Sequence, residues 1–338
     1  MAICPLLVWC LLFISMLIPI YFICMRVLMI KKVIILAFLL VTVIVGFIPV
    51  TTSVGVHINA QYVNLLQQLQ VAHNWIKWQP QLKQAEGGFK VDSTSQGFQI
   101  RAQGTALKVK FDNSSSFSVT QTSLGKQAQY TYTVGPDSSI NDAIIIVSYK
   151  TNLMGYWRSK FSDQAIKNNP VWNLKAFMED TRLYYGFKIE RQQTEGKQVL
   201  VKRMTVPKTG WYSQGGQAQA ALNNFISNNQ LHALGGVQIQ ATTIPSDSVQ
   251  LMVGIAINKK AKVAGTPLQL LQMPAGKILV GYYQGAYKNK QKIYSAMQLY
   301  IQDKYLHSLI LPIEKFTDNK LPQSDDDVVH MQVIIPYI

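Results

Sequence analysis

The stretch VQIQATTIPSDSVQLMVGIAIN, residues 237–258, recurs in altered form as LPIEKFTDNKLPQSDDDVVHMQVIIPY, residues 311–337. Each copy alternates like a pair of strands, and each follows a segment with helical spacing, AQAALNNFISNN (218–229) or KIYSAMQLYIQDKY (292–305). A strand-like run precedes each helix, so a strand–helix–strand–strand (βαββ) unit occurs twice. Two such units can pair through their sheets and leave a groove along the pseudo-twofold axis.

The chain upstream of this repeat has a different organisation. A strand-like segment at 54–61 leads into helical spacing at 62–70 and then into NWIKWQP, which contains Trp75 and Trp78. Short alternating pieces follow, separated by Gly, Asn, Ser and Asp, as is typical of an antiparallel meander. The segment SDQAIKNNPVWNLKAFMEDT predicts a closing helix, with Pro170 inside it or interrupting it. This order predicts a curved sheet wrapped on a helix.

Two apolar runs open the sequence. Ala2–Met25 has no charge, and Val33–Val50 is free of charge over a length that just suffices for a helix to cross a bilayer. The charges between them are Arg26, Lys31 and Lys32, and positive flanks stay on the cytoplasmic side. We therefore expect a single- or double-pass membrane anchor with the C-terminal domains extracytoplasmic. A cleaved signal peptide is the alternative, and whether the first 24 residues are translated stays open.

Charge and residue usage exclude several functions. The chain has 32 Lys and Arg against 17 Asp and Glu, but the basic residues are dispersed, which suits anionic lipid heads or general solubility. No helix-turn-helix, RNP-like or zinc-finger spacing occurs, so we expect no nucleic-acid partner. All three cysteines lie in the first 25 residues and the five histidines lack metal-ligand spacing, so we expect no metal and no cofactor.

The segment LPIEKF places a carboxylate inside a short apolar run. In a strand, Pro312, Glu314 and Phe316 share one face while Lys315 points to the other. A carboxylate beside aromatic rings suits a cationic guest, whereas the alternative is a solvated strand face. The repeat aligns Gln240 with Glu314, so a polar side chain on the same face of both strands indicates that this face binds something.

Aromatic residues near this strand complete the predicted binding site. Tyr287 stands at a Gly-x-Tyr turn and Tyr283 precedes it, whereas packing against the sheet is the default role of Tyr294. Trp211 falls in a Gly-rich stretch that we expect to be a flexible loop covering the groove or its edge. No catalytic residue is assigned, and the predicted ligand-binding residues are Glu314, Phe316, Tyr283, Tyr287, Trp211 and Gln240.

Both halves resemble known families. The element order with NWIKWQP resembles the START-like (SRPBCC, polyketide cyclase-like) superfamily over 54–180, which implies a deep apolar cavity between sheet and closing helix. Residues 183–338 resemble the GyrI-like (AraC-type) effector-binding family in YYGFKIE, in LPIEKF and in HMQVIIPY. This second resemblance implies a groove for amphipathic, often cationic small molecules, and the family's acidic residue falls on Glu314 in Pro-x-Glu-x-Phe.

Together these observations predict an α+β fold with an N-terminal transmembrane helix in 1–50, a helix-grip START-like domain in 54–180 and a duplicated βαββ GyrI-like domain in 183–338. The predicted function is a membrane-anchored binding protein for amphipathic, often cationic small molecules. One alternative is a hydrolase of a reactive small molecule that uses Glu314 as acid–base. Another is a structural or interaction module without a ligand. The ligand and any protein partners stay open.

Overall fold

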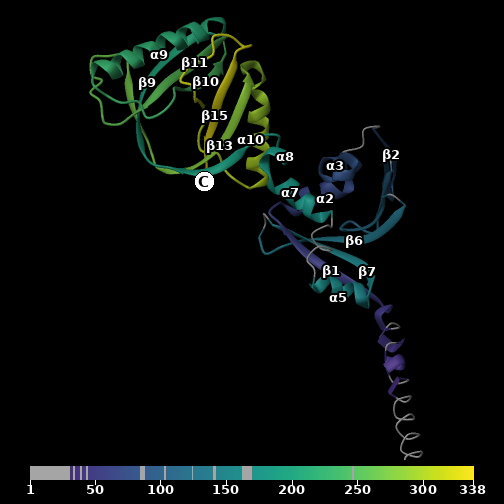
Figure 1. Cartoon of the computed structure of the whole chain (residues 1–338). Helices are drawn as coiled ribbons and strands as arrows, with labels where there is room; N and C mark the ends of the chain where they lie inside the picture. The colour runs from purple at the N-terminus through teal and green to yellow at the C-terminus, as the bar shows by residue number, and fades with distance from the viewer. Residues whose placement is uncertain are drawn as a thin grey trace, which may run out of the picture.

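Antiparallel strands make up most of the described chain, and they form two separate sheets accompanied by few helices (Figure 1). The computed structural model describes residues 31–338 except 33, 34, 39, 43, 44, 84–87, 103, 124, 140, 141, 162–169 and 246. The seven-stranded sheet lies within residues 49–152, and the eight-stranded sheet within residues 189–336.

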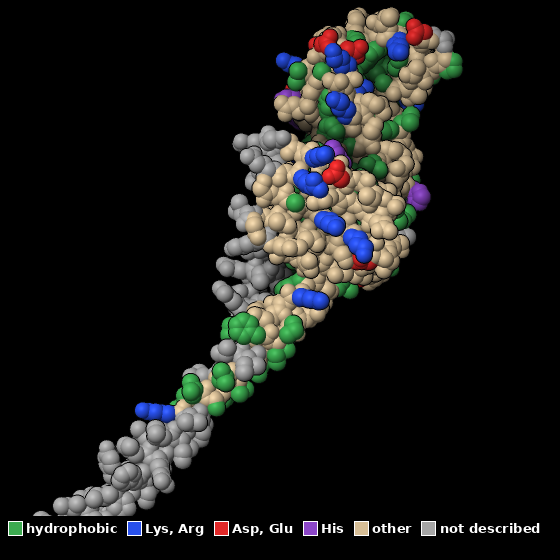
Figure 2. Space-filling view, turned by 90° about the vertical axis from the view of Figure 1, so that its right-hand side faces the viewer, with side chains coloured by type: hydrophobic (Ala, Val, Ile, Leu, Met, Phe, Trp, Pro, Cys, Tyr) green, Lys and Arg blue, Asp and Glu red, His purple; other side chains and the backbone are tan. Residues whose placement is uncertain are grey.

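The predicted transmembrane helix over Val33–Val50 is wrong. The described residues between 31 and 46 are helical, but the chain turns at Phe47 and its next residues already belong to strand β1 (Pro49–Ile58). Within the described part of the chain, no helix combines the length and the apolar character that crossing a bilayer requires. Figure 2 shows exposed hydrophobic side chains on this helical segment. The apolar run Ala2–Met25, with the cysteines, lies outside the described residues, and an extracytoplasmic location stays a prediction.

The first sheet is a strongly regular meander with the strand order β1-β7-β6-β5-β4-β3-β2. Its strands after β1 are β2 (Phe89–Thr94), β3 (Gly97–Ala102), β4 (Thr105–Phe111), β5 (Ser116–Ser123), β6 (Lys126–Pro136) and β7 (Ala143–Asn152). The helices that accompany it are α2 (Tyr62–Gln70), α3 (Ala72–Trp78), α4 (Pro80–Lys83), α5 (Leu153–Phe161), α7 (Val171–Glu179) and α8 (Thr181–Tyr184). Helix α7 begins directly after Pro170, which suits a proline because its missing N–H would have no helical acceptor.

Trp75 lies at the centre of the first core. It is fully buried, its ring stacks on that of Tyr132 with centroids 6.1 Å apart, and its indole Nε1 donates to the carbonyl of Leu69 at 2.9 Å. The Trp78 ring lies 4.5 Å from it. The two tryptophans of NWIKWQP therefore stabilise the packing of α3 against the sheet, since large aromatic rings contribute much of the apolar area that a core buries.

The second sheet has the order β12-β9-β11-β10-β14-β15-β13-β8. Its strands are β8 (Ile189–Thr194), β9 (Lys197–Pro207), β10 (Gln238–Ile244), β11 (Ser248–Ile257), β12 (Gln269–Met273), β13 (Gly276–Ala286), β14 (Ile313–Phe316) and β15 (Val328–Pro336). Its helices are η1 (Lys208–Gly210), α9 (Trp211–Asn228), η2 (Tyr287–Asn289) and α10 (Gln291–Asp303).

Two βαββ units meet at the centre of this sheet. The first unit is β9-α9-β10-β11, the second is β13-α10-β14-β15, and β10 pairs with β14 through Gln238↔Lys315 and Ile239↔Glu314. Side chains of α9 and α10, among them Leu222 and Met297, share one core with alternate sheet residues such as Leu251. Both helices therefore cover the same face of the sheet, and the other face has no helix in that core.

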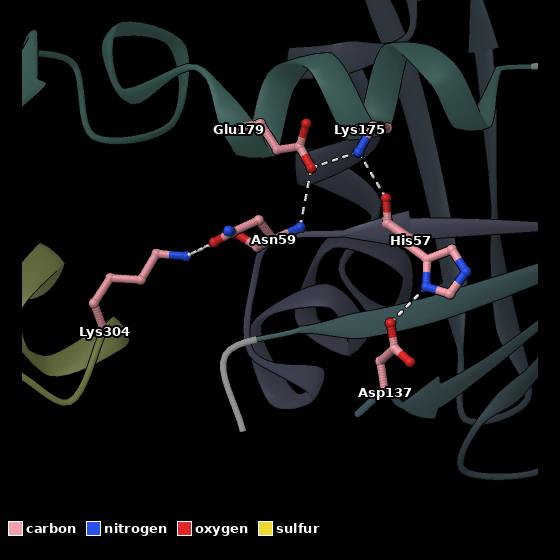
Figure 3. A network of polar contacts seen from close by, with 6 residues as sticks. All are labelled: His57, Asn59, Asp137, Lys175, Glu179 and Lys304. Atoms are coloured by element: carbon pink, nitrogen blue, oxygen red, sulfur yellow. Dashed lines mark hydrogen bonds and ion pairs between the residues drawn. The ribbon is translucent and has the colours of Figure 1, made fainter. Parts of the chain in front are cut away.

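A polar network joins the two halves (Figure 3). Lys304, directly after α10, donates from Nζ to the backbone carbonyl of Asn59 at 2.8 Å and also to the side-chain oxygen of that residue. The Asn59 backbone N–H in turn donates to Glu179 Oε1 at 3.0 Å, and Lys175 forms an ion pair with the same carboxylate. Burial, and after it the positive charge of Arg191, lowers the pKa of Lys304.

Candidate functional site

Glu314 is buried in the middle of the second sheet, on the face that the helices cover. Its strand, β14, is only four residues long and lies between β10 and β15. The residue is 4% exposed, while its neighbour Lys315 is partly exposed on the opposite face. A buried carboxylate is stable only when hydrogen bonds and an opposite charge compensate for its lost hydration, so its partners decide what the site can do.

Three donors satisfy this carboxylate. The Tyr287 hydroxyl donates to Oε2 at 2.8 Å, the Tyr294 hydroxyl donates to Oε1 at 2.6 Å, and Lys290 Nζ donates to Oε1 at 2.6 Å. They come from η2, from the residue directly before α10 and from α10 itself, where spacings of three and four residues place side chains on one side of the turn and helix. The carboxylate therefore has protein partners without any ligand.

The phenols are held in their protonated form. Burial, and after it the negative charge of Glu314, raises the pKa of Tyr287 far above its ordinary value, and the same two causes raise the pKa of Tyr294. Both hydroxyls consequently act as hydrogen-bond donors to the carboxylate at any physiological pH. They keep the negative charge at one fixed place in the site.

Aromatic rings form the wall next to this charge. The Trp211 ring lies 4.1 Å from the Tyr212 ring and 5.6 Å from the Tyr287 ring, measured between centroids. The ammonium of Lys290 lies 4.0 Å from the centroid of the Tyr287 ring. The side chain of Tyr212 is fixed by its hydroxyl, which donates to Asp325 Oδ1 at 2.5 Å.

A cavity of about 400 Å³ opens between these groups. Besides the aromatic residues and the Glu314–Lys290 pair, its lining includes Lys208, Thr243, Leu311 and Pro312. The volume falls within the range of about 300–1,000 Å³ that is usual for small-molecule sites. Apolar rings together with a few fixed polar groups make the cavity suitable for an amphipathic molecule.

The structure brings together three of the six residues predicted for the site. Glu314, Tyr287 and Trp211 line the same cavity. Trp211, however, is the first residue of α9 and only 9% exposed, so the predicted flexible loop is wrong. Phe316 is fully buried in the core beneath, with its ring centroid 6.3 Å from that of Tyr287, and Tyr283 is buried with its hydroxyl donating to the Ala286 carbonyl at 2.6 Å.

Gln240 does not reach this cavity. The strand register pairs Ile239 with Glu314, and directly opposed residues of an antiparallel pair point to the same face. Gln240 therefore points to the opposite face, where its amide nitrogen donates to the Leu311 carbonyl at 3.0 Å. The prediction that Gln240 and Glu314 share one face is therefore wrong, because successive residues of a strand point to opposite faces.

Sequence reasoning missed Lys290 and Tyr212 and assigned Tyr294 only a packing role. The signal for Lys290 and Tyr294 was present in the spacing Tyr287-x-x-Lys290-x-x-x-Tyr294, which places the three on one side of a helical turn. Within the described ranges, no group of three or more His, Cys, Asp or Glu side chains is placed to hold a metal ion.

Comparisons with known proteins yield structural similarity only. No family model matches the chain, and no curated protein matches it. Among solved structures, the EcmrR C-terminal domain is similar at 15% identity and a TM-score of 0.38, over 45% of this chain and 98% of that one. EcmrR in a complex with DNA matches at 14% identity and a TM-score of 0.37, over 45% of this chain and 57% of that one. SAV2435, bound to tetraphenylphosphonium, matches at 13% identity and a TM-score of 0.30, over 45% and 94%.

This chain thus spans little more than half of EcmrR in its DNA complex and nearly all of the isolated C-terminal domain. The predicted START-like resemblance of residues 54–180 and the expected absence of a nucleic-acid partner stay predictions. At such TM-scores the likeness carries no functional argument, so a function for this chain has to be argued from the side chains of the Glu314 cavity.

Proposed function

We propose that the Glu314 cavity binds an amphipathic small molecule whose positively charged group takes the place of the Lys290 ammonium. The observation that supports this is the position of that ammonium, 2.6 Å from Glu314 Oε1 and 4.0 Å from the centroid of the Tyr287 ring. A carboxylate and the face of an aromatic ring both attract a cation. The chain thus holds its own cation at the point where a cationic ligand would be most stable.

Exchange of the Lys290 ammonium for a ligand cation is physically feasible because the Lys290 side chain is more exposed than the carboxylate that it contacts. The Lys290 side chain is 27% exposed and that of Glu314 is 5% exposed. A lysine carries its charge on a flexible stem, so the ammonium can move into water while the carboxylate stays in place. The phenols of Tyr287 and Tyr294 would continue to donate to the carboxylate, which therefore would not be left without partners.

The net affinity would come from the apolar part of the ligand. Replacing one ammonium by another roughly conserves the charge interactions, whereas burial of a hydrophobic body against Trp211 and Tyr212 adds about 25 cal/mol for each Å² removed from water. A compact polar cation would gain little from this exchange. The proposal therefore predicts selectivity for cations with a bulky aromatic or aliphatic body.

Calorimetric titration tests this proposal with tetraphenylphosphonium as the cation and triphenylphosphine oxide as a neutral compound of related shape. Glu314→Gln should weaken binding of the cation by roughly ten- to a hundredfold, which corresponds to about 1–3 kcal/mol. Lys290→Met should strengthen it by about tenfold because the competing internal cation is gone. Binding of the neutral compound should change little in both variants.

Lys292→Met is the matched control, since this lysine lies on the same helix with an exposed side chain outside the cavity lining. It should leave both titrations unchanged. Equal affinity of the wild type, Glu314→Gln and Lys290→Met for tetraphenylphosphonium would refute the exchange.

A further inference from the structure

A second cavity lies on the face of the eight-stranded sheet that no helix of the common core covers. It measures about 550 Å³, and Val199, Ile278 and Ile334 in its lining alternate along their strands with residues of the core that α9 and α10 share, so these three point away from the helices. Val199, at its edge, belongs to a small separate cluster with Val201 and Ala256. This cavity is therefore distinct from the Glu314 site, which lies on the other side of the sheet.

Its lining is mainly aliphatic. The sheet contributes Ile278, Ile313, Ile334 and Pro336 to the lining. The hydrophobic residues at its mouth are unusually exposed, with Leu309 at 54% and Ile310 at 47% of their accessible surface. Hydrophobic side chains exposed next to an apolar cavity are typical of a surface that binds an apolar partner.

The charged groups of this cavity are positive. Lys197 and Lys277 belong to its lining, and no described Asp or Glu does. None of the ion pairs found among the described residues involves these two lysines or Lys315, which follows Ile313 on the same face. Burial, and after it the charge of Lys197, lowers the pKa of Lys315, so these two lysines lie close enough to repel each other.

We propose that this second cavity binds a long-chain carboxylate, with the hydrocarbon chain against Ile278, Ile313 and Ile334 and the carboxylate at Lys197 and Lys277. Charge complementarity selects this ligand, because the unpaired lysines attract an anionic head and repel a cationic one. Most of the lining between these lysines is aliphatic, which suits a hydrocarbon chain better than a polar ligand.

Residues 309–314 separate the two sites. Leu309, Ile310 and Ile313 contact the second cavity, whereas Leu311, Pro312 and Glu314 line the first. The two ligand classes have opposite charges, so each site can be tested by a ligand that the other should not take. The outcome at one site does not depend on the function proposed for the other.

The test is a calorimetric titration of the full chain with dodecanoate, dodecanol and dodecyltrimethylammonium, each below its micellar concentration. Wild type should bind dodecanoate more tightly than dodecanol. Binding of dodecyltrimethylammonium, which suits the Glu314 cavity, should be weakened by Glu314→Gln and not by changes of Lys197 and Lys277. The double change Lys197→Gln and Lys277→Gln should weaken dodecanoate binding by about tenfold or more and leave dodecanol unchanged. Glu314→Gln should not affect dodecanoate.

A second variant tests the hydrocarbon part. Ile310→Asp places a charge at the exposed mouth without touching the core, and it should weaken both dodecanoate and dodecanol. Leu299→Asp is its control, because Leu299 is 47% exposed on α10 and outside the cavity. No measurable dodecanoate binding, or the same affinity in wild type, the double lysine variant and Ile310→Asp, would overturn the proposal.

Discussion

The Glu314–Lys290 pair can be tested through stability, without any ligand. Changing Glu314 to Gln keeps the shape but removes the charge that accepts from two phenols and one ammonium. Hydrogen bonds to a charged group contribute about 1.5–3 kcal/mol and neutral ones about 0.5–1.5 kcal/mol. Because Lys290 is partly exposed and can be hydrated again, we expect a loss of about 2–3 kcal/mol in the free energy of unfolding.

The reverse change, Lys290→Met, leaves the carboxylate buried with only the hydroxyls of Tyr287 and Tyr294. We expect a loss of about 2 kcal/mol, since the hydrogen bonds from the ammonium to Glu314 and to the Tyr287 hydroxyl disappear and the remaining charge is no longer neutralised. The double variant should lose less than the sum of the two, because each single change already removes the pair. A coupling energy of about 1–2 kcal/mol is expected.

Urea unfolding of the wild type, the two single variants and the double variant measures this double-mutant cycle. Amide hydrogen exchange of β14 and β15 assigns the unfolding transition to the second sheet. The loss of stability in Glu314→Gln distinguishes the hydrogen-bonded carboxylate of this structure from a buried carboxylate without protein partners. In the latter case the protein would become more stable when the charge is removed. Additivity of the two changes within about 0.3–0.5 kcal/mol, or stabilisation by Glu314→Gln, would refute the arrangement described.

Three further predictions concern other parts of the structure. The pKa of Tyr287 is raised in the folded state, so the contribution of this phenol to the free energy of unfolding is complete below pH 10 and is lost as the pH rises further. In unfolding measured above pH 10, the stability of the wild type should therefore fall more steeply than that of Tyr287→Phe, by about 1.4 kcal/mol per pH unit. Lys304→Ala should increase amide exchange at Asn59, with unchanged exchange in β14, because it removes two of the hydrogen bonds that join the two halves. Gly236→Ala should destabilise the second sheet by about 3 kcal/mol or more in thermal unfolding, since the added Cβ would lie 1.8 Å from a backbone carbonyl oxygen of β14. Gly216→Ala in α9 is the control: its Cβ would meet no atom within 4 Å, so this change should be neutral or stabilising in the same assay.

Local patterns predicted several individual elements of this chain. AIIIVSYKTNL alternates as expected of a strand and forms β7, and the helical spacing of KIYSAMQLYIQDKY corresponds to α10. In β7 the core buries Ala143, Ile145 and Val147, whereas Ile146 between them is exposed; in α10 it buries Ile293, Met297 and Ile301. Patterns of this kind are visible in sequence because burial acts on each element separately.

Features that depend on tertiary contacts could not be obtained in this way. The glycines at 215 and 216 disfavour a helix, yet α9 includes them because Trp211 at its start packs against Tyr287. The apolar segment 33–50 has the composition of a membrane span, but its last residues pair with β7 as the start of β1. The position of Gln240 depends on the register between β10 and β14, and a weak repeat does not define that register to one residue.

A crystal structure of the full chain with tetraphenylphosphonium would show directly whether a ligand cation displaces Lys290. We expect the phosphonium centre within about 6 Å of the Tyr287 ring centroid, phenyl groups against Trp211 and Tyr212, and the Lys290 ammonium moved away from Glu314 into solvent. A complex in which the Lys290–Glu314 ion pair is intact and the cation lies outside the cavity would contradict this expectation.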